Sequence, residues 1–227
     1  MINVGMIGTN NVSQQFADAV KESPYFHLTS IYDDSLNEAT KFAQLNGSVA
    51  YFDDIDKFFN VGDFDTVYVA SPNSVHFNQV SKAITHGKNV IGEKTAFANS
   101  TEMDKILDLL EENPEVMYFE GMRHIHTPNF HAMEEQFDNM EEITGANLIY
   151  SKYSSTYDAV RAGETPSLFD LNLGGGALQD LGVYPVYDAL VLFGMPETVS
   201  YFPQIIRTGV DGKGTGILRY KDFDVTI

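Results

Sequence analysis

The sequence predicts an α/β protein, with a doubly wound parallel sheet in its first part and an α+β region with an open, mostly antiparallel sheet in its second. Two observations support this prediction. Short apolar runs alternate with helical patterns from the first residue to about position 120, which is typical of βαβ units. From about Gly121 the pattern changes to longer β-like runs with one strong helix. We therefore expect two domains, residues 1–120 and 121–227.

The first domain shows the alternation element by element. Short apolar runs predict buried strands at 2–7, 28–32, 66–70, 89–91 and 116–119. Apolar residues at helical spacing predict amphipathic helices between them, around residues 12–20, 36–43, 80–84 and 103–110. Because the carboxyl ends of parallel strands open onto one crevice, we expect a ligand site at that edge of the sheet.

Four segments of the second domain resemble strands, at 146–153, 198–206, 215–220 and 223–227, and we expect them to pair antiparallel. The last of them ends without a following turn or partner. Folded proteins usually cover or blunt such an unpaired edge. This leads to the expectation that the sequence is a truncated version of a longer protein, with its C-terminal part missing.

Composition limits the possible partners. A formal net charge of −18, from 32 acidic against 14 basic residues, would repel phosphate backbones, so nucleic acid is not an expected partner. The absence of Cys suits a reducing compartment, and we expect the protein in the cytoplasm. No stretch approaches the ~20 apolar residues of a membrane span. His124 and His126 have no third ligand in register, so no bound metal is expected.

The segment from Gly5 to Ser13 lies where the first strand turns into the first helix, a place where backbone N–H groups can hold a pyrophosphate. Its glycine pattern departs from the dinucleotide fingerprint at Asn10 and Ser13. Asn tolerates a left-handed backbone and Ser is small, so both substitutions are acceptable. A tight turn without a ligand is the alternative. The residues predicted to bind a dinucleotide here are Gly8, Thr9, Asn10, Asn11 and Val12.

Asp33 and Asp34 follow the second strand, about 25 positions after Gly8. This is close to the ~20-residue offset at which an acid hydrogen-bonds the adenosine ribose. Two carboxylates would repel a 2′-phosphate and no Arg lies beside them, so we favour NAD over NADP and assign the ribose to Asp33. The alternative is that either Asp caps the helix beginning near Leu36.

Two further segments resemble a known family. Ala70-Ser71-Pro72-Asn73-Ser74-Val75-His76, followed by Gly92-Glu93-Lys94, resembles a strand-end Pro-Asn turn and a Glu-Lys-Pro motif. The run Gly174-Gly175-Gly176-Ala177-Leu178-Gln179-Asp180-Leu181-Gly182-Val183-Tyr184-Pro185 resembles a glycine-rich entry to the helix that closes the active site. The family is that of glucose-fructose oxidoreductase, inositol dehydrogenase and MocA (Gfo/Idh/MocA), with an N-terminal Rossmann domain. The likeness covers essentially the whole chain.

The resemblance implies that Lys94 stands between nicotinamide and substrate, and that the helix supplies Asp180 and Tyr184. Residues four apart on a helix share a face, so Asp180 and Tyr184 would point at one place. A Tyr or Lys with a lowered pKa can take the hydroxyl proton as the hydride leaves, and Lys94 would also stabilise the alkoxide. These three residues are the predicted catalytic groups, and together with Arg123 they are the predicted substrate-binding groups. Further cofactor-binding residues implied by the resemblance are Ser71, Pro72, Asn73, His76, Glu93 and Lys94.

Some of these residues have alternative interpretations. Lys94 could be a solvated surface lysine, and Tyr184 a core tyrosine with a satisfied hydroxyl. Arg123 either binds substrate or bridges the domains. Thr95 replaces the proline of the motif. A tyrosine rather than a histidine at 184 resembles the glucose-fructose oxidoreductase and dimeric dihydrodiol dehydrogenase branches more than the inositol dehydrogenase branch.

We therefore expect an NAD(P)-dependent dehydrogenase that acts on a sugar, an inositol or a cyclic diol. As the resemblance implies, the open sheet of the second domain would form a homodimer or a dimer of dimers. The alternative, suggested by Asn10 and Thr95, is a non-catalytic dinucleotide sensor or regulatory protein of the same fold. An inactive fragment is a third possibility.

Overall fold

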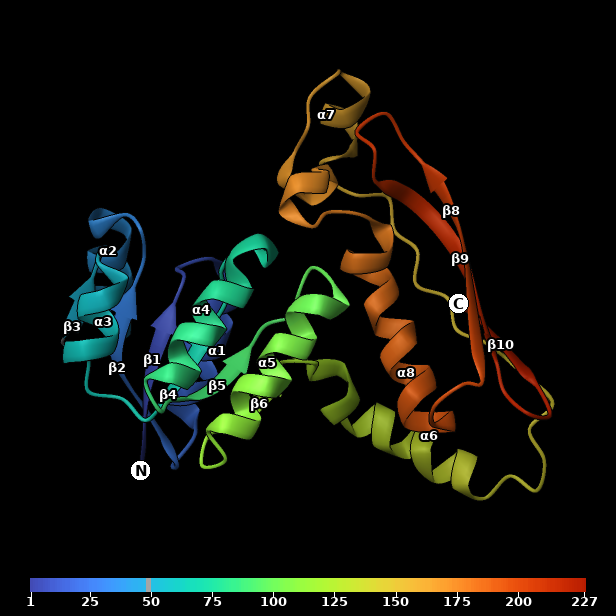
Figure 1. The fold of residues 1–227 in the computed structure, drawn as a ribbon, viewed down its shortest axis with the longest axis horizontal. Helices are drawn as coiled ribbons and strands as arrows, with labels where there is room; N and C mark the ends of the chain where they lie inside the picture. Colours follow the sequence, from blue (N-terminus) through green and yellow to red (C-terminus); the bar gives the residue numbers. More distant parts are fainter. Residues whose placement is uncertain (48–49) are drawn as a thin grey trace. The chain divides into compact units, whose positions relative to one another are not determined.

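The computed structural model describes residues 1–47 and 50–227 (Figure 1). The chain divides into two compact units, Met1–Gly121 and Met122–Ile227, and each is described by itself. No helix in the described part is long and apolar enough to cross a membrane.

The first unit is built on one parallel sheet in the strand order β3-β2-β1-β4-β5-β6. This is the strand order of a doubly wound nucleotide-binding sheet. The chain adds strands outward in one direction from β1 to β3 and in the other direction from β4 to β6, so the strand order reverses between β1 and β4. The predicted fold of this part is therefore confirmed. The strands are β1 (Ile2–Ile7), β2 (Phe26–Tyr32), β3 (Ala50–Phe52), β4 (Thr66–Val69), β5 (Asn89–Gly92) and β6 (Tyr118–Glu120).

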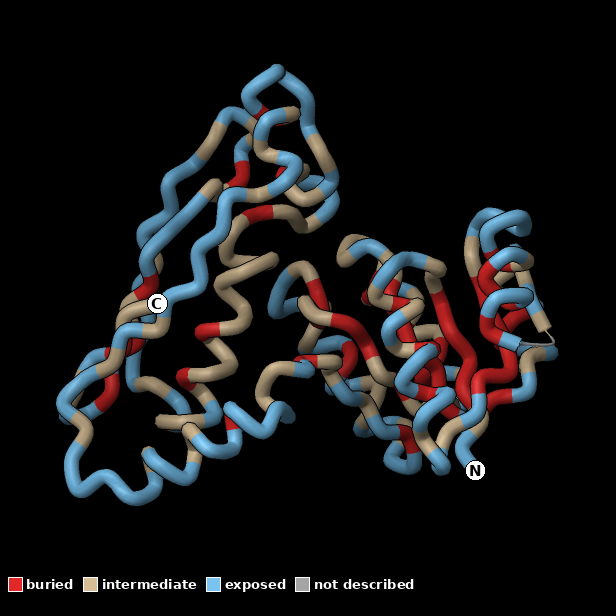
Figure 2. Tube along the Cα trace, turned by 180° about the vertical axis from the view of Figure 1, so that it is seen from behind, coloured by how far each residue is buried: buried red, intermediate tan, exposed pale blue. Residues whose placement is uncertain are grey.

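Helices cover both faces of this sheet. The five helices are α1 (Asn11–Glu22), α2 (Leu36–Asn46), α3 (Ile55–Val61), α4 (Asn73–Thr85) and α5 (Ser100–Glu112). One apolar cluster joins α1 and α2 to the sheet through Ala17, Ala39 and Met6. The other joins α3, α4 and α5 to it through residues such as Phe58 and Ile84. The sheet is thus the buried middle layer, and Figure 2 shows its strands among the most buried segments of this unit.

Two elements of the first unit were not predicted. β3 is three residues long and has no buried residue, so it carries none of the apolar alternation by which the other strands are recognised. α3 has seven residues and follows β3 closely. The sequence feature that could have indicated α3 is Asp54, a residue type that often caps helices. In the structure, the Asp54 side chain accepts hydrogen bonds from the backbone N–H groups of Asp56 and Lys57.

The second unit has a four-stranded sheet in the order β7-β10-β9-β8. Its strands are β7 (Ala146–Asn147), β8 (Thr198–Ile205), β9 (Asp211–Arg219) and β10 (Asp224–Thr226). β8 and β10 pair antiparallel with β9, as predicted. β7 pairs parallel with β10, so the prediction of antiparallel pairing is wrong for that pair.

The predicted strand at 146–153 is wrong beyond Asn147. A strand needs a partner, and the short β10 offers hydrogen bonds only to residues 146–148, ending with Leu148 N to Thr226 O at 2.9 Å. Ile149, with an exposed fraction of 81%, therefore has an apolar strand-like sequence but no regular structure. β9 begins earlier than predicted, at Asp211, because alternate glycines mask its apolar pattern.

The helical elements of the second unit are η1 (Arg123–His126), α6 (Pro128–Asp138), α7 (Tyr157–Arg161), η2 (Ser167–Phe169), η3 (Leu171–Leu173), η4 (Leu178–Gly182) and α8 (Val183–Phe193). η4 is one turn of π-helix that runs directly into α8. α8 packs on the sheet through Ala189, which lies in one apolar cluster with Leu218 and Val225. This packing places one long helical segment, Leu178–Phe193, across the sheet.

Candidate functional site

The turn between β1 and α1 lies at the point where the strand order of the first unit reverses. Gly8 has a φ of +94°, and a Cβ there would lie 2.8 Å from the carbonyl oxygen of Ala70. Only glycine fits this combination of left-handed backbone and close approach. The Gly8 N–H donates to Tyr32 O at 2.9 Å, which ties the turn to the end of β2.

A cavity of about 500 Å³ opens at this turn. It brings together the ends of β1, β2 and β4, as expected for the ligand crevice of such a sheet. Its lining includes six of the residues predicted to bind a dinucleotide, namely Gly8, Thr9, Asn10, Asp33, Ser71 and Pro72. It also includes Asp34, Val75, Asn78 and Gln79, of which the last three face it from α4 and were not predicted.

Asn10 caps helix α1. Its side-chain oxygen accepts from the N–H groups of Val12 at 2.9 Å and Ser13 at 3.0 Å, and its side-chain nitrogen donates to Ala70 O at 2.6 Å. With φ at −80° and ψ at −176°, its backbone is extended, so the substitution for glycine needs no left-handed conformation. Ser13 is fully buried, as the third fingerprint position requires. Asn11 and Val12 form the first turn of α1.

Asp33 is held by two local hydrogen bonds. Its carboxylate accepts from Thr9 Oγ1 at 2.7 Å and from Ser35 N at 2.9 Å. Ser35, rather than either aspartate, is the N-cap of α2, so the alternative assignment of Asp33 or Asp34 as the cap of that helix is wrong. The carboxylate instead joins the turn between β1 and α1 to the end of β2.

Asp34 accepts a short hydrogen bond from the Tyr32 hydroxyl. Burial, followed by this bond and the nearby charges of Asp34 and Asp33, raises the pKa of Tyr32 above its ordinary value. The tyrosine therefore stays a protonated donor at neutral pH, and it fixes the direction of the second carboxylate beside the cavity.

The Pro-Asn turn after β4 positions the first turn of α4. Ser71 donates to Gln79 Oε1 at 2.5 Å, and Pro72 and Asn73 begin the helix. His76 is buried, and its two ring nitrogens lie 2.8 Å from Ser71 O and 3.2 Å from Thr95 O. Because both nitrogens face backbone carbonyls, the ring links this turn to the segment that follows β5.

Glu93 and Lys94 follow β5. Glu93 is buried, and one of its carboxylate oxygens accepts from the Tyr68 hydroxyl at 2.5 Å. Lys94 is half-buried, and the Lys94–Thr95 peptide bond is cis. Neither residue is among those that line the cavity at the turn between β1 and α1. Glu120 accepts from Ala96 N at 2.9 Å and so fastens the next stretch to β6.

In the second unit, Asp180 and Tyr184 lie on the continuous helical segment η4–α8, as predicted. Asp180 is in the π-helical turn, and its N–H donates to Gly176 O at 3.0 Å. Both side chains are half-buried. Arg123 lies in η1 and is exposed.

The ring of Tyr184 is held between two other rings. His124 lies 5.0 Å away, centroid to centroid, and Tyr150 lies 5.2 Å away, both edge-on. His124 Nε2 is 2.6 Å from an oxygen of Asp188, so the carboxylate fixes the imidazole. All four side chains line a cavity of about 490 Å³.

Sequence reasoning did not single out Asp188 or Tyr150 in this cavity. Asp188 had a signal, because Asp180, Tyr184 and Asp188 recur at helical spacing. Tyr150 had none, since it lies in an irregular stretch that was predicted to be a strand.

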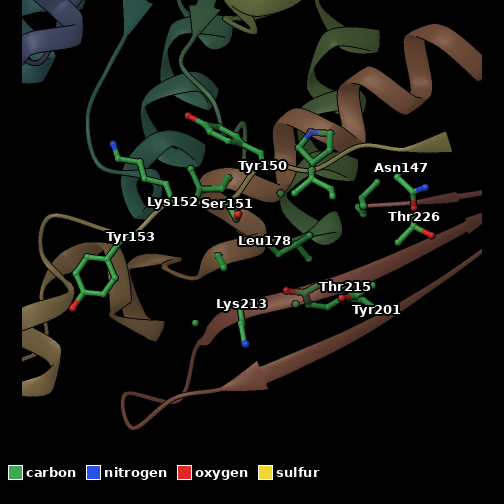
Figure 3. Close-up of a pocket in the computed structure, with 18 residues that line it drawn as sticks. Asn147, Tyr150, Ser151, Lys152, Tyr153, Leu178, Tyr201, Lys213, Thr215 and Thr226 are labelled. Carbon is green, nitrogen blue, oxygen red and sulfur yellow. The ribbon is translucent and has the colours of Figure 1, made fainter.

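A larger cavity, of about 600 Å³, lies in the same unit between the helical segment and the sheet (Figure 3). Leu178 faces it from the helical side, and Tyr201 and Thr215 face it from the strands. None of the predicted site residues lines it. In the described part of the chain, no group of three or more His, Asp or Glu side chains could hold a metal ion.

Comparison with known families agrees with this geometry. Residues 2–121 match the family described as an oxidoreductase family with an NAD-binding Rossmann fold, and residues 143–227 match the GFO/IDH/MocA C-terminal domain. The two matches define a nicotinamide-dinucleotide-binding oxidoreductase fold. This chain belongs to the Gfo/Idh/MocA family.

Two relatives and one solved structure illustrate the similarity. The chain is 34% identical, over all of its length and 69% of the relative's, to the scyllo-inositol 2-dehydrogenase (NADP(+)) IolU of Bacillus subtilis (strain 168). It is 24% identical to the trans-1,2-dihydrobenzene-1,2-diol dehydrogenase of Xenopus laevis, over 95% of this chain and 64% of that one. The crystal structure of KijD10, a 3-ketoreductase from Actinomadura kijaniata in complex with NADP and TDP-benzene, superposes with a TM-score of 0.84 at 21% identity. That superposition covers 99% of this chain and 68% of KijD10.

The predicted family and fold are thus confirmed.

Proposed function

We propose that this protein is an NAD(P)-dependent oxidoreductase that transfers a hydride between nicotinamide and a hydroxyl-bearing carbon of a sugar, an inositol or a cyclic diol. The observation that carries the proposal is the cavity at the reversal point of the parallel sheet, where Gly8 and Asp33 meet. The names of the relatives support the class of substrate.

Four side chains are proposed to carry the chemistry and to bind the substrate. The hydroxyl proton must leave as the carbinol carbon is oxidised, and the phenolate form of Tyr184 accepts it and becomes the phenol. The Lys94 ammonium stabilises the alkoxide and the tyrosinate by its charge. Asp180 binds a neighbouring hydroxyl of the substrate, and Arg123 binds the substrate from η1. A bound nicotinamide supplies the hydride acceptor for the oxidation.

NAD is proposed as the favoured cofactor. The supporting observation is that Asp33 and Asp34 both line the cavity, where two carboxylates would repel a 2′-phosphate. The name of the Bacillus relative carries NADP(+), so the two cofactors have to be compared directly. We expect NADH to bind at least about tenfold more tightly than NADPH, which corresponds to about 1.4 kcal/mol.

The environment of the enzyme follows from the same reasoning. We propose a cytoplasmic protein, since a chain without Cys suits a reducing compartment. We also propose a dimer formed through the sheet of the second unit, in which β8 is an edge strand. Equilibrium sedimentation at several protein concentrations tests the assembly.

A second candidate function is a dinucleotide sensor without turnover. One observation favours it. The N–H groups of Val12 and Ser13 donate hydrogen bonds to the side chain of Asn10, and a bound phosphate would need those same donors.

A binding and turnover experiment tests the proposal and separates the two candidates. NADH and NADPH are titrated by fluorescence, and oxidation is then assayed on a panel of inositols, aldoses and cyclic diols. Turnover on at least one of them supports the enzyme, whereas tight binding with no turnover on any supports the sensor. Lys94→Ala is expected to lower kcat about 10²–10³-fold while NADH still binds.

The control for that variant is Lys41→Ala, which removes an equal charge from an exposed ion pair with Glu38 on α2. It is expected to leave both properties unchanged. Full turnover in Lys94→Ala would remove this lysine from the mechanism.

A further inference from the structure

The helical segment that carries Asp180 and Tyr184 begins without a local cap. The first N–H groups of a helix have no partner within the helix and need one from elsewhere. The residue at the N-cap of η4 is Ala177, whose side chain cannot accept a hydrogen bond. The residues before it are three glycines, which have no side chains to offer.

A carboxylate from the sheet takes this place. The N–H of Leu178 donates to Oδ2 of Asp211 at 2.8 Å, although the two residues are 33 positions apart. Asp211 is the first residue of β9. A negative charge at a helix N-terminus is favourable, because the backbone dipoles leave partial positive charge there.

The carboxylate of Asp211 is itself held in place. The Tyr201 hydroxyl donates to the same oxygen at 2.5 Å. Burial, followed by this hydrogen bond, raises the pKa of Tyr201 above its ordinary value, so the phenol remains a donor at neutral pH. Figure 3 shows Tyr201 on its strand and Leu178 on the helical side of the cavity.

Gly176 lets the carboxylate approach the start of the helix. A Cβ at this position would overlap Oδ1 of Asp211, and the φ of +135° also disfavours any other residue. The carbonyl of Gly176 in turn accepts from the N–H of Asp180 at 3.0 Å. Asp211, Gly176 and Asp180 are therefore joined by direct contacts across the first turn.

We infer that Asp211 is a positioning residue, which fixes where this helical segment begins and hence where Asp180 and Tyr184 point. It does not have to touch the substrate for this role. The inference rests on the proposed function for its catalytic consequence. A misplacement of about 1 Å in a catalytic group can cost about 100-fold in rate.

The test uses three variants of the whole chain. Asp211→Ala removes the carboxylate, Asp211→Asn keeps an uncharged acceptor of the same shape, and Asp224→Asn is a control. Asp224 lies on β10 of the same sheet, where its carboxylate pairs with the exposed Arg219. Four quantities are measured: kcat and KM on an active polyol, the dissociation constant of NADH, and the rate of hydrogen exchange at the Leu178 amide.

We expect kcat to fall by a different factor in each Asp211 variant, while the affinity for NADH does not change. Asp211→Ala lowers kcat about 100-fold, and Asp211→Asn lowers it about tenfold because a neutral acceptor makes a weaker bond. The Leu178 amide exchanges about tenfold faster in Asp211→Ala and about threefold faster in Asp211→Asn, whose neutral acceptor makes a weaker hydrogen bond. NADH affinity stays unchanged in all three variants, and Asp224→Asn matches the parent protein.

Two results would overturn the inference. One is unchanged exchange at Leu178 in Asp211→Ala, or in Asp211→Asn if the alanine variant does not fold. The other is a loss of kcat accompanied by an equal loss of NADH affinity, which would indicate general damage. Because amide exchange needs no substrate, it decides the role of Asp211 even if the parent protein turns over no polyol, which would count against the proposed function alone.

Discussion

Two helices in this protein begin at turns that are proposed to be functional, and the residues that cap them come from different places in the sequence. Helix α1 of the first unit is capped by Asn10, which is adjacent to it in the chain. The helical segment at Leu178 in the second unit is capped by Asp211, which lies 33 residues further on. The cap of α1 is therefore local in the sequence, whereas the cap of the second segment comes from a strand that is distant in the sequence.

The two units are proposed to divide the work along the same line. The turn at α1 lines the dinucleotide cavity, and the segment at Leu178 carries Asp180 and Tyr184. If this division is correct, changes at the first turn alter cofactor affinity, and changes on the second helix alter turnover.

The largest effect is expected for Tyr184→Phe. The substitution removes the phenolic oxygen, which is the proposed proton acceptor, but it keeps the aromatic ring between His124 and Tyr150. We expect kcat to fall about 10²–10⁴-fold with unchanged NADH affinity, because general base catalysis contributes about that much. Steady-state kinetics and fluorescence titration measure the two quantities.

Tyr25→Phe is the control, since this tyrosine is 70% exposed in the first unit. It is expected to match the parent protein. A drop in NADH affinity in Tyr184→Phe equal to the drop in kcat would break the proposed division between the units.

A smaller effect is expected for Gly8→Ala, and it concerns the affinity for NADH rather than kcat. The added Cβ would lie 2.8 Å from Ala70 O, and the φ of +94° is strained for alanine. We expect NADH affinity to fall about 100-fold, or about 3 kcal/mol, because the turn has to open to relieve the contact. Calorimetric titration with NADH measures the loss.

Gly87→Ala separates strain from crowding. Gly87 also has a positive φ, of +66°, but a Cβ there would have nothing within 4 Å. This variant is expected to lose about 1 kcal/mol of stability and to bind NADH normally. If Gly8→Ala behaves like Gly87→Ala, the close approach to Ala70 has no part in cofactor binding.

The same contrast explains how much of the fold could be predicted from the sequence. β1, β2 and β4 contain runs of consecutive buried residues and β5 is partly buried, so their positions could be predicted from apolar runs to within a few residues. β3 has no buried residue and could not be found that way. In the second unit, the stretch 149–153 has the composition of a strand but no neighbouring strand to pair with, and pairing is not a local property.

The candidate site divides similarly. Gly8, Asp33 and Ser71 could be predicted because a glycine turn and strand-end polar residues meet at one edge of a parallel sheet. Asp211 could not, because nothing near it in sequence indicates that it reaches Leu178. Glu93 was predicted to contact the cofactor, but its hydrogen bond to Tyr68 depends on the neighbouring strand and was not foreseen.

The smallest expected effect concerns cofactor choice within the first unit. Asp33→Ser removes a carboxylate that lines the cavity while a small polar side chain remains beside Thr9. We expect the preference for NADH over NADPH to shrink about tenfold, since one charge repelling the 2′-phosphate is gone. Parallel titrations of both cofactors give this ratio.

Asp34→Asn makes the same change in charge one residue further on. Because the Asp34 carboxylate is directed toward the Tyr32 hydroxyl, we expect a shift of about threefold or less. Equal shifts in the two variants would mean that net charge, rather than the position of Asp33, sets the preference. An unchanged ratio in both would show that the 2′-phosphate does not approach this end of β2, and the ribose would then have to be assigned to another part of the cavity.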